Sequence, residues 1–219
     1  MRNLTLSVKR SAFRSDDPKS PEADEKYKLL KPEVLKNGDY ECEFCGFRSI
    51  KFQHIHHLDD NHQNNERSNL VIACPLCHMC NHIGYSGERQ LGTLIYLDKD
   101  LELKQSDFNN LVRFLWIGSE SKNQEIKMYA ENMLDRLYNM TTHARRLLKS
   151  NDLTLFGDFL MGLSNTDYKK RADKLNGFYF LPYKSAFKRE LENWLRNVKI
   201  SDPKNWVEIA KQKEHIIFE

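Results

Sequence analysis

The sequence predicts an α+β protein, with short strands in its first half and a mainly helical C-terminal region. Three observations lead to this class. Residues 3–10 alternate apolar and polar side chains, as a strand does, and residues 39–87 hold all five cysteines and six of the eight histidines. From about Ser106, apolar residues recur at helical spacing. We therefore expect an N-terminal strand and loop over 1–38, a cysteine-rich module over 39–104 and a helical region over 105–219.

Composition limits the kinds of function that are open to the chain. It has 219 residues, of which 30% are charged and 40% hydrophobic, which suits one or two globular domains with a real core. The net charge of +3 is too small to indicate nucleic-acid binding by itself. No apolar run approaches the roughly 20 residues that span a bilayer. Because the first ten residues do not form a signal peptide, we expect a cytoplasmic protein, and reduced cysteines that bind metal rather than form disulfides.

Two Cys-x-x-Cys pairs predict a structural zinc site. Cys42 and Cys45 form the first pair, Cys74 and Cys77 the second, and 28 residues (46–73) separate the pairs. Two-residue spacing lets both thiolates of a pair point at one tetrahedral ion, and structural Zn²⁺ favours four such sulfurs. Buried free thiols or a redox pair are the alternatives, but the strand-to-helix context of a redox pair is absent. In this register the fifth cysteine, Cys80, is a small buried apolar residue on the following helix.

Histidines lie between and after the cysteine pairs in a regular order. His56 and His57 are adjacent, Asn69 follows, and His78 and His82 are four residues apart, which places them on one face of a helix. Over about residues 40–84 this series resembles the HNH nuclease family, also called the ββα-metal fold. Its pattern is a histidine doublet on a strand, an asparagine in the connection and a metal-binding histidine on a helix. The four cysteines are similar to those of HNH members that carry a structural zinc.

The HNH resemblance implies a role for each of these residues. His57 is implied as the general base that activates a water, and Asn69 as the residue that holds the loop and so orients the imidazole of His57. His56, His78 and His82 are implied as ligands of a second, divalent ion, which offsets negative charge in the transition state.

A scaffold in which these histidines only support the zinc site is the competing interpretation. Between residues 39 and 77, the only basic residues that could contact phosphate are Arg48, Lys51 and Arg67, against several acids. We therefore expect no enzymatic activity, and keep a metal-dependent HNH nuclease with His57 as general base as the alternative function. The remaining histidines are expected on the surface or in loops without a role: His54, His62, His143 and His215.

The rest of the chain predicts mostly helices. Before the cysteines, we expect a loop over 11–24 and a weak helix over 25–36, and after them an extended segment over 91–97. A helix should then begin at Ser106, with Leu111, Phe114 and Leu115 as its apolar stripe, followed by helices over 121–149, from Asn151-Asp152 to Leu163 and over 165–175. The chain should continue with an extended segment over 176–183, a helix over 185–199 and a last helix from Ser201. The aromatic residues 178–183 are expected either in the core or as an anchor for a partner.

Residues 92–97 and 105–113, together with the CPLCHMCNH stretch over 74–82, resemble the IcmJ (DotN) family of the Dot/Icm type IVB secretion system. This resemblance implies a zinc-stabilised adaptor that is not an enzyme. It implies binding to the C-terminal region of the coupling ATPase DotL and to other coupling-complex subunits, and support of effector recruitment and export. The expected location is peripheral, at the cytoplasmic face of the inner membrane, without direct insertion. A DNA-binding zinc module is a third interpretation, and no nucleic-acid partner is favoured.

Overall fold

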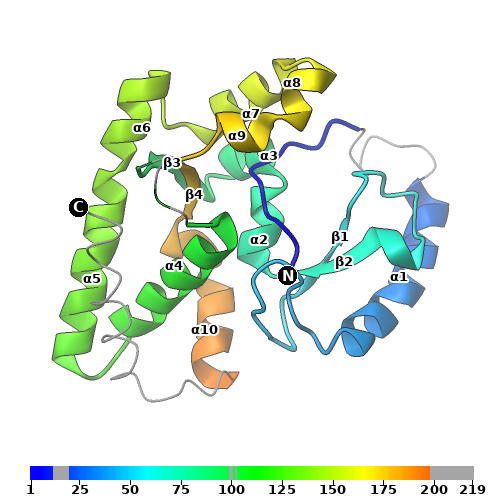
Figure 1. Cartoon of the computed structure of the whole chain (residues 1–219). Coiled ribbons are helices and arrows are strands. Elements are labelled where there is room, and N and C mark those ends of the chain that lie inside the picture. The colour runs from blue at the N-terminus through cyan, green and yellow to red at the C-terminus, as the bar shows by residue number, and fades with distance from the viewer. Residues whose placement is uncertain (12–19, 99–100, 102, 198–219) are drawn as a thin grey trace.

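The structure, a computed structural model, describes residues 1–11, 20–98, 101 and 103–197 (Figure 1). It confirms the α+β class: helices combine with two two-stranded antiparallel sheets within the described residues. No helix among these residues is both long and apolar enough to cross a membrane. The elements follow the order α1 (Ser20–Asn37), β1 (His54–His57), η2 (Arg67–Asn69), β2 (Leu70–Ala73), α2 (Pro75–Cys80), α3 (Ile83–Glu88), β3 (Gly92–Tyr96), α4 (Gln105–Ser119), α5 (Gln124–Asn139), α6 (Thr141–Leu148), α7 (Leu153–Gly162), α8 (Asn165–Lys169), α9 (Arg171–Lys174), β4 (Phe178–Pro182), η3 (Lys184–Phe187) and α10 (Lys188–Asn197).

The β1–β2 hairpin lies between helices α1 and α2 (Figure 1). Its strands pair antiparallel, with His54 opposite Ala73 and His57 opposite Leu70. Ile55 and Leu70 pack with Val34 of α1 in a small core of their own. Because successive strand residues point to opposite faces, the neighbours of Ile55 point away from α1. This alternation directs His56 toward α2.

The second sheet joins distant parts of the sequence. In it β3 pairs with β4, with Gly92 opposite Pro182 and Tyr96 opposite Phe178. A Cβ atom at Gly92 would lie 2.4 Å from the carbonyl oxygen of Leu181, so only glycine lets the strands approach this closely. The main hydrophobic core contains residues from both sides of residue 104, the cysteines included. The cysteine-rich module and the helical region therefore share the main hydrophobic core.

The aromatic stretch over 178–183 is core. Tyr179, Phe180 and Leu181 of β4 are almost completely buried, and the Tyr179 ring packs against Phe108 of α4. Only Tyr183, just after the strand, lines a groove on the surface. Of the two expectations for this stretch, the structure matches the first.

The N-terminal segment is extended but is not a strand, contrary to the sequence prediction. Leu4, Leu6 and Val8 are buried, as the alternation predicts. However, the backbone of Ser7 bonds to the ends of helices: its N–H donates to the carbonyl of Cys80, and its carbonyl accepts from the N–H of Ile83. The alternation of apolar and polar residues predicts which side chains point inward. It does not predict whether another strand pairs with this segment. The predicted loop over 11–24 is also too long, since α1 begins at Ser20.

The predicted helix over 121–149 is two helices, α5 and α6, with Met140 between them. The hydroxyls of Thr141 and Thr142 donate to the carbonyls of Tyr138 and Asn139, and such side-chain bonds compete with regular helical pairing. The segment 165–175 likewise divides into α8 and α9, and 185–199 begins with the 3-10 turn η3. Asp152 caps α7 as predicted. The helix predicted from Ser201 lies outside the described residues.

Helices α3 and α7 touch through glycine. A Cβ atom on Gly157 of α7 would lie 2.5 Å from the Cα atom of Gly84 in α3. Because the clash would be with backbone atoms, no flexible side chain could move aside to relieve it. The contact between α3 of the cysteine-rich module and α7 of the helical region thus depends on the absence of a side chain.

Gly157→Ala should lower the free energy of unfolding by about 1–3 kcal/mol, because the methyl group must push two helices apart. Gly162→Ala on the same helix is the matched control: a Cβ atom there meets nothing within 4 Å. It should leave stability unchanged or raise it slightly, by up to about 1 kcal/mol, because alanine restricts the unfolded chain. Chemical denaturation measures both. Equal stability of the two variants would contradict the close α3–α7 contact.

Candidate metal sites

The four cysteines of the two pairs converge from two turns, which we call the knuckles. In the first, Gly46 adopts a φ of 72°, and the amide of Gly46 donates to the carbonyl of Cys42. This left-handed conformation suits glycine and closes the turn. In the second, Cys74 precedes α2 with Pro75 at the first helical position, so Cys77 follows within the first turn.

The geometry of the four sulfurs is compatible with one bound metal ion. All four are buried and free of disulfides. Their Sγ atoms lie within 4.8 Å of one another, and those of Cys45 and Cys74 are 3.7 Å apart. Thiolates bound to one tetrahedral Zn²⁺ at about 2.3 Å lie roughly 3.8 Å from each other. The donor set and its spacing therefore fit a four-sulfur site.

Helix α4 supplies polar contacts to these sulfurs that the sequence analysis missed. Arg113 Nη2 donates to Cys74 Sγ at 3.0 Å, and Asn109 Nδ2 donates to Cys77 Sγ at 3.3 Å. Burial alone would raise the pKa of the Cys74 thiol. Hydrogen bonds from the other three thiols and the charge of Arg113 outweigh burial and hold that pKa well below its usual range.

The expected apolar stripe of α4 was only partly right. Leu115 is buried, but Leu111 and Phe114 are only partly buried. The inward face also carries three polar residues at intervals of four, Gln105, Asn109 and Arg113. This spacing of polar residues was the available signal for the contacts to the cysteines.

Cys80 matches its prediction as a buried residue outside the four-cysteine set. It is completely buried at the end of α2. Its thiol donates to the carbonyl of Leu76 at 3.2 Å. Burial raises the pKa of this thiol, so it remains protonated near neutral pH.

Three histidines form a second cluster, apart from the cysteines. The ligand atoms of His56, His78 and His82 lie within 4.8 Å of one another. His78 and His82 do not share a helix as predicted, because α2 ends at Cys80 and His82 precedes α3. Their rings nevertheless remain adjacent, with centroids 4.8 Å apart. Strand β1 supplies the third histidine from across the module.

The same cluster includes a histidine that the sequence analysis set aside. His54 lies on β1, and its ring centroid is 4.8 Å from that of His78, so the expectation of a surface or loop histidine was wrong. Since His54 and His56 are two residues apart on a strand, they share a face, and that spacing was the missed signal. His62 is also buried rather than exposed. His143 is exposed on α6 as expected, and His215 lies outside the described residues.

The clustered histidines are held in their neutral form. Burial, followed by the nearby charges of His82 and His57, lowers the pKa of His56 to about 3. Burial and Lys9 lower the pKa of His82 to about 4, and burial lowers that of His78 well below its usual value. A neutral imidazole is the form that ligates metal. Residues His56, His78 and His82 are thus prepared for a cation without first losing a proton.

His57 ends β1, and Asn69 lies in η2 just before β2. Asn69 Nδ2 donates to Asp59 Oδ1 at 2.8 Å and to the carbonyl of Asn64, and it thereby holds the loop after β1. The imidazole of His57 contacts a different asparagine, since its Nε2 is 3.1 Å from Asn65 Oδ1. An amide oxygen only accepts, so Nε2 is the donor in this contact. Asn65 is a further site residue that sequence reasoning missed.

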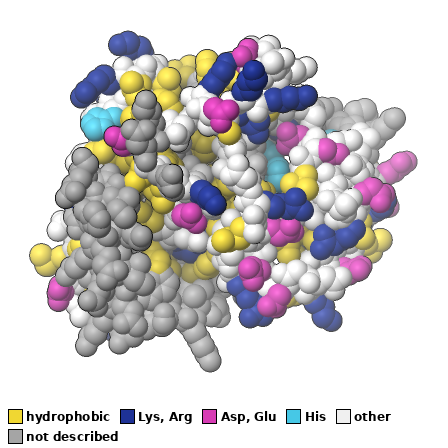
Figure 2. Space-filling model, viewed as in Figure 1, with side chains coloured by type: hydrophobic (Ala, Val, Ile, Leu, Met, Phe, Trp, Pro, Cys, Tyr) yellow, Lys and Arg dark blue, Asp and Glu magenta, His cyan; other side chains and the backbone are white. Residues whose placement is uncertain are grey.

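These histidines line one pocket of about 370 Å³. Lys9 from the N-terminal segment also lines it, together with Asp60. Lys9 was overlooked because only residues 39–77 were searched for basic side chains. Elsewhere, acidic and basic side chains are interspersed over much of the described part of the face that Figure 2 shows.

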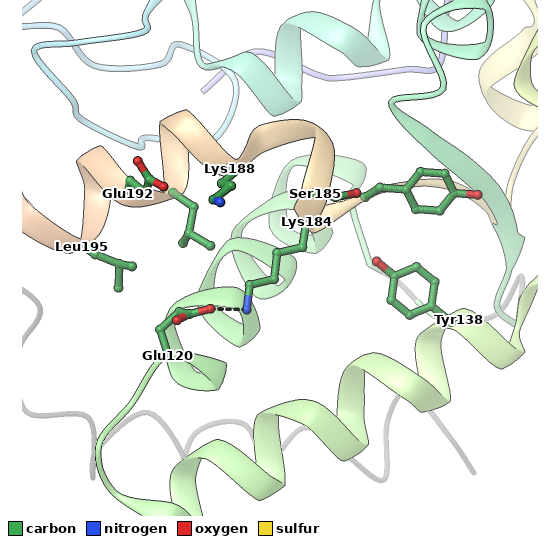
Figure 3. A pocket seen from close by; sticks show the side chains of 9 residues that line it. Glu120, Tyr138, Lys184, Ser185, Lys188, Glu192 and Leu195 are labelled. Atoms are coloured by element: carbon green, nitrogen blue, oxygen red, sulfur yellow. Dashed lines mark hydrogen bonds and ion pairs between the residues drawn. The ribbon is translucent and has the colours of Figure 1, made fainter.

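A separate groove of about 580 Å³ lies on the helical region. Leu191 and Leu195 of α10 line it together with Tyr138 of α5, and Lys184 forms an ion pair with Glu120 beside them (Figure 3). Leu195 is 39% exposed. The groove combines apolar surface with a few charges.

Comparison with known proteins gives two relatives of different kinds, while no protein-family model matches the chain. The chain is 28% identical over 183 residues to the type 4 apparatus protein DotN of Legionella pneumophila, an alignment that covers 78% of this chain and 80% of DotN. It is 38% identical over 76 residues to the H-N-H endonuclease F-TflIV of Escherichia phage T5, covering 29% of this chain and 34% of the nuclease. The resemblance to the DotN family, with an HNH-like module inside it, is thereby confirmed.

Metal analysis of protein purified without chelator should give about one zinc per chain. Cys42→Ser and Cys77→Ser should lose zinc and much of their solubility, because binding free energy at such a site is also folding free energy. Cys80→Ser is the matched control and should keep both the metal and the fold. Less than a third of one zinc per chain in the wild type would contradict the four-cysteine site.

Proposed function

We propose that this chain, as a relative of DotN over most of its length, is a subunit of the coupling complex of a type IV secretion apparatus, acting as an adaptor rather than an enzyme. It binds the C-terminal region of the coupling ATPase and supports recruitment and export of effector proteins. Through that complex it lies peripherally at the cytoplasmic face of the inner membrane. The similarity to DotN carries this proposal, because it extends over 78% of the chain and so well beyond the cysteine module.

In this proposal, one structural zinc ion holds the knuckles together. Four sulfur ligands leave no open coordination position, which is typical of zinc that stabilises a fold and does not catalyse. Such a site would make the module a rigid support for helix α10, which packs on Arg113 beside the cysteines and carries part of the surface assigned to the partner below. A captured segment then orders itself against a surface that is already formed, which lowers the entropy cost of binding.

The groove in Figure 3 is the surface that we assign to the partner segment. Leu191 and Leu195 on one side and Tyr138 on the other offer the apolar contacts that an amphipathic segment needs. The ion pair of Lys184 with Glu120 lies at the groove and supplies polar groups that fix register.

Calorimetric titration with the C-terminal region of the coupling ATPase tests this function. The wild type should bind in the micromolar range, and His57→Ala should bind equally well because no chemistry is involved. Leu195→Asp should weaken binding by about tenfold or more, about 1.4 kcal/mol, by placing a charge in the groove. Met128→Asp on α5 is the matched control, since Met128 is an exposed side chain that does not line the groove.

Absence of wild-type binding up to about 100 μM would count against the adaptor function. Dependence of binding on His57, with the fold intact, would do the same. Equal binding by Leu195→Asp and the wild type would leave the adaptor function standing and move the partner segment to another surface.

A metal-dependent nuclease is the second candidate function, and one observation favours it: the histidine cluster keeps every residue that the HNH pattern requires. His57 is the residue to which this pattern assigns the role of general base. His56, His78 and His82 are the residues that would hold a divalent ion. Its positive charge would offset the negative charge of a phosphorane transition state. Lys9 adds a cation to the same pocket.

Against this candidate stand the interspersed surface charges and the short extent of the similarity to the phage nuclease. We therefore expect no plasmid cleavage with Mg²⁺, Mn²⁺ or Ni²⁺. Gel analysis of supercoiled plasmid measures this directly. Cleavage by the wild type that disappears in a folded His57→Ala variant would show that the chain is an enzyme after all.

A further inference from the structure

Arg113 is a buried cation whose contacts are unusual. Its side chain is only 3% exposed. In the part of the chain that the structure describes, its side-chain hydrogen bonds go to Cys74 Sγ and to the amide oxygen of Asn110, and none of them reaches a carboxylate. Its Nε atom is buried without a hydrogen bond among those residues. Burying a guanidinium in this way is costly unless an anion lies nearby.

The cysteine sulfurs are the anion that this position offers. Zn²⁺ with four thiolates has a net charge of about −2, so a metal-loaded site needs positive charge around it. Arg113 Nη2 lies 3.0 Å from Cys74 Sγ, a distance suited to a charge-assisted bond. A lone thiol would not balance a buried arginine, whereas a metal–thiolate centre would.

Aromatic rings enclose the guanidinium away from the sulfur. The central carbon of Arg113 lies 3.8 Å from the ring centroid of Phe47, beside the first knuckle, and 5.1 Å from that of Trp194 on α10. Phe47 and Trp194 also contact each other edge-to-face. Cation–π contacts of this kind strengthen when water is excluded. One side chain of α4 therefore touches both knuckles and α10.

We infer that Arg113 is the internal counter-ion of the metal–thiolate centre and transmits metal occupancy to the packing of helices α4 and α10. This inference rests on the zinc site of the proposed function and goes beyond it. With the metal bound, Arg113 balances the charge and slows metal release. With the metal removed, the four sulfurs are no longer held around one ion, Arg113 loses its fixed partner, and the contact with Trp194 loosens.

Arg113→Met tests the counter-ion role, because methionine fills similar volume without charge. It should accelerate zinc transfer to a chromogenic chelator by about 10- to 100-fold, the usual range for losing a partner of a metal ligand. Arg113→Lys keeps the charge and should fall between the wild type and the methionine variant. Arg145→Met is the matched control. Arg145 lies on α6 and donates a hydrogen bond to Asn151, and its replacement should leave the rate of zinc transfer unchanged.

Tryptophan fluorescence of the full-length protein tests the coupling independently, should Arg113→Met fail to fold. Removing zinc from the wild type should change the emission, readdition should restore it, and Trp194→Phe should abolish most of the change. Zinc transfer from a folded Arg113→Met variant at the wild-type rate, or zinc removal without any change in emission, would overturn the inference. Neither result bears on partner binding. If purified wild-type protein contains no zinc, both the metal site and this inference are contradicted.

Discussion

The four sulfurs of the knuckles lie where separate parts of the chain meet. The first knuckle follows α1 and the second begins α2. Helix α4 reaches the first through Asn110, which donates to the carbonyl of Cys45, and the second through Asn109 and Arg113. The N-terminal segment is fastened beside them by the backbone bonds of Ser7 to Cys80 and Ile83. Short strands and six-residue helices cannot bury enough apolar surface to hold such an arrangement alone. The proposed ion, shared by both knuckles, would be the interaction that holds these pieces in one arrangement.

What the sequence allowed us to predict was mostly local. The spacing of Cys42, Cys45, Cys74 and Cys77 is a local pattern, and so is the cap of α7 at Asp152, because each depends on residues within one turn. The histidine doublet with Asn69 was also readable, because it follows a known order along the chain. The break at Met140 was not, since apolar periodicity continues through it and threonine side chains decide the outcome.

What the sequence could not predict was non-local. Nothing in residues 92–96 indicates that 178–182 is their partner, and hydrophobic alternation at 3–10 could not distinguish a strand from an extended segment held by helix ends. Polar residues that serve a site from another element, such as Asn65 and Arg113, look like ordinary solvated positions when only apolar spacing is counted. A buried polar residue becomes visible only when its partner is known.

The pairing of β3 with β4 bears on the order in which this chain is made. Helices α4 to α9 lie between the two strands in sequence, so the ribosome must synthesise all of them before the sheet can close. The entropy cost of closing a loop grows only slowly with its length, so the long separation of β3 and β4 adds little to that cost. Such non-local pairing does, however, slow folding. During that interval, the knuckles are already outside the ribosome while Leu94 and the face of α2 still lack their cover. The nascent chain thus exposes apolar surface for longer than its size suggests, and early capture of metal would give its first half an ordered centre while the second half is still being made.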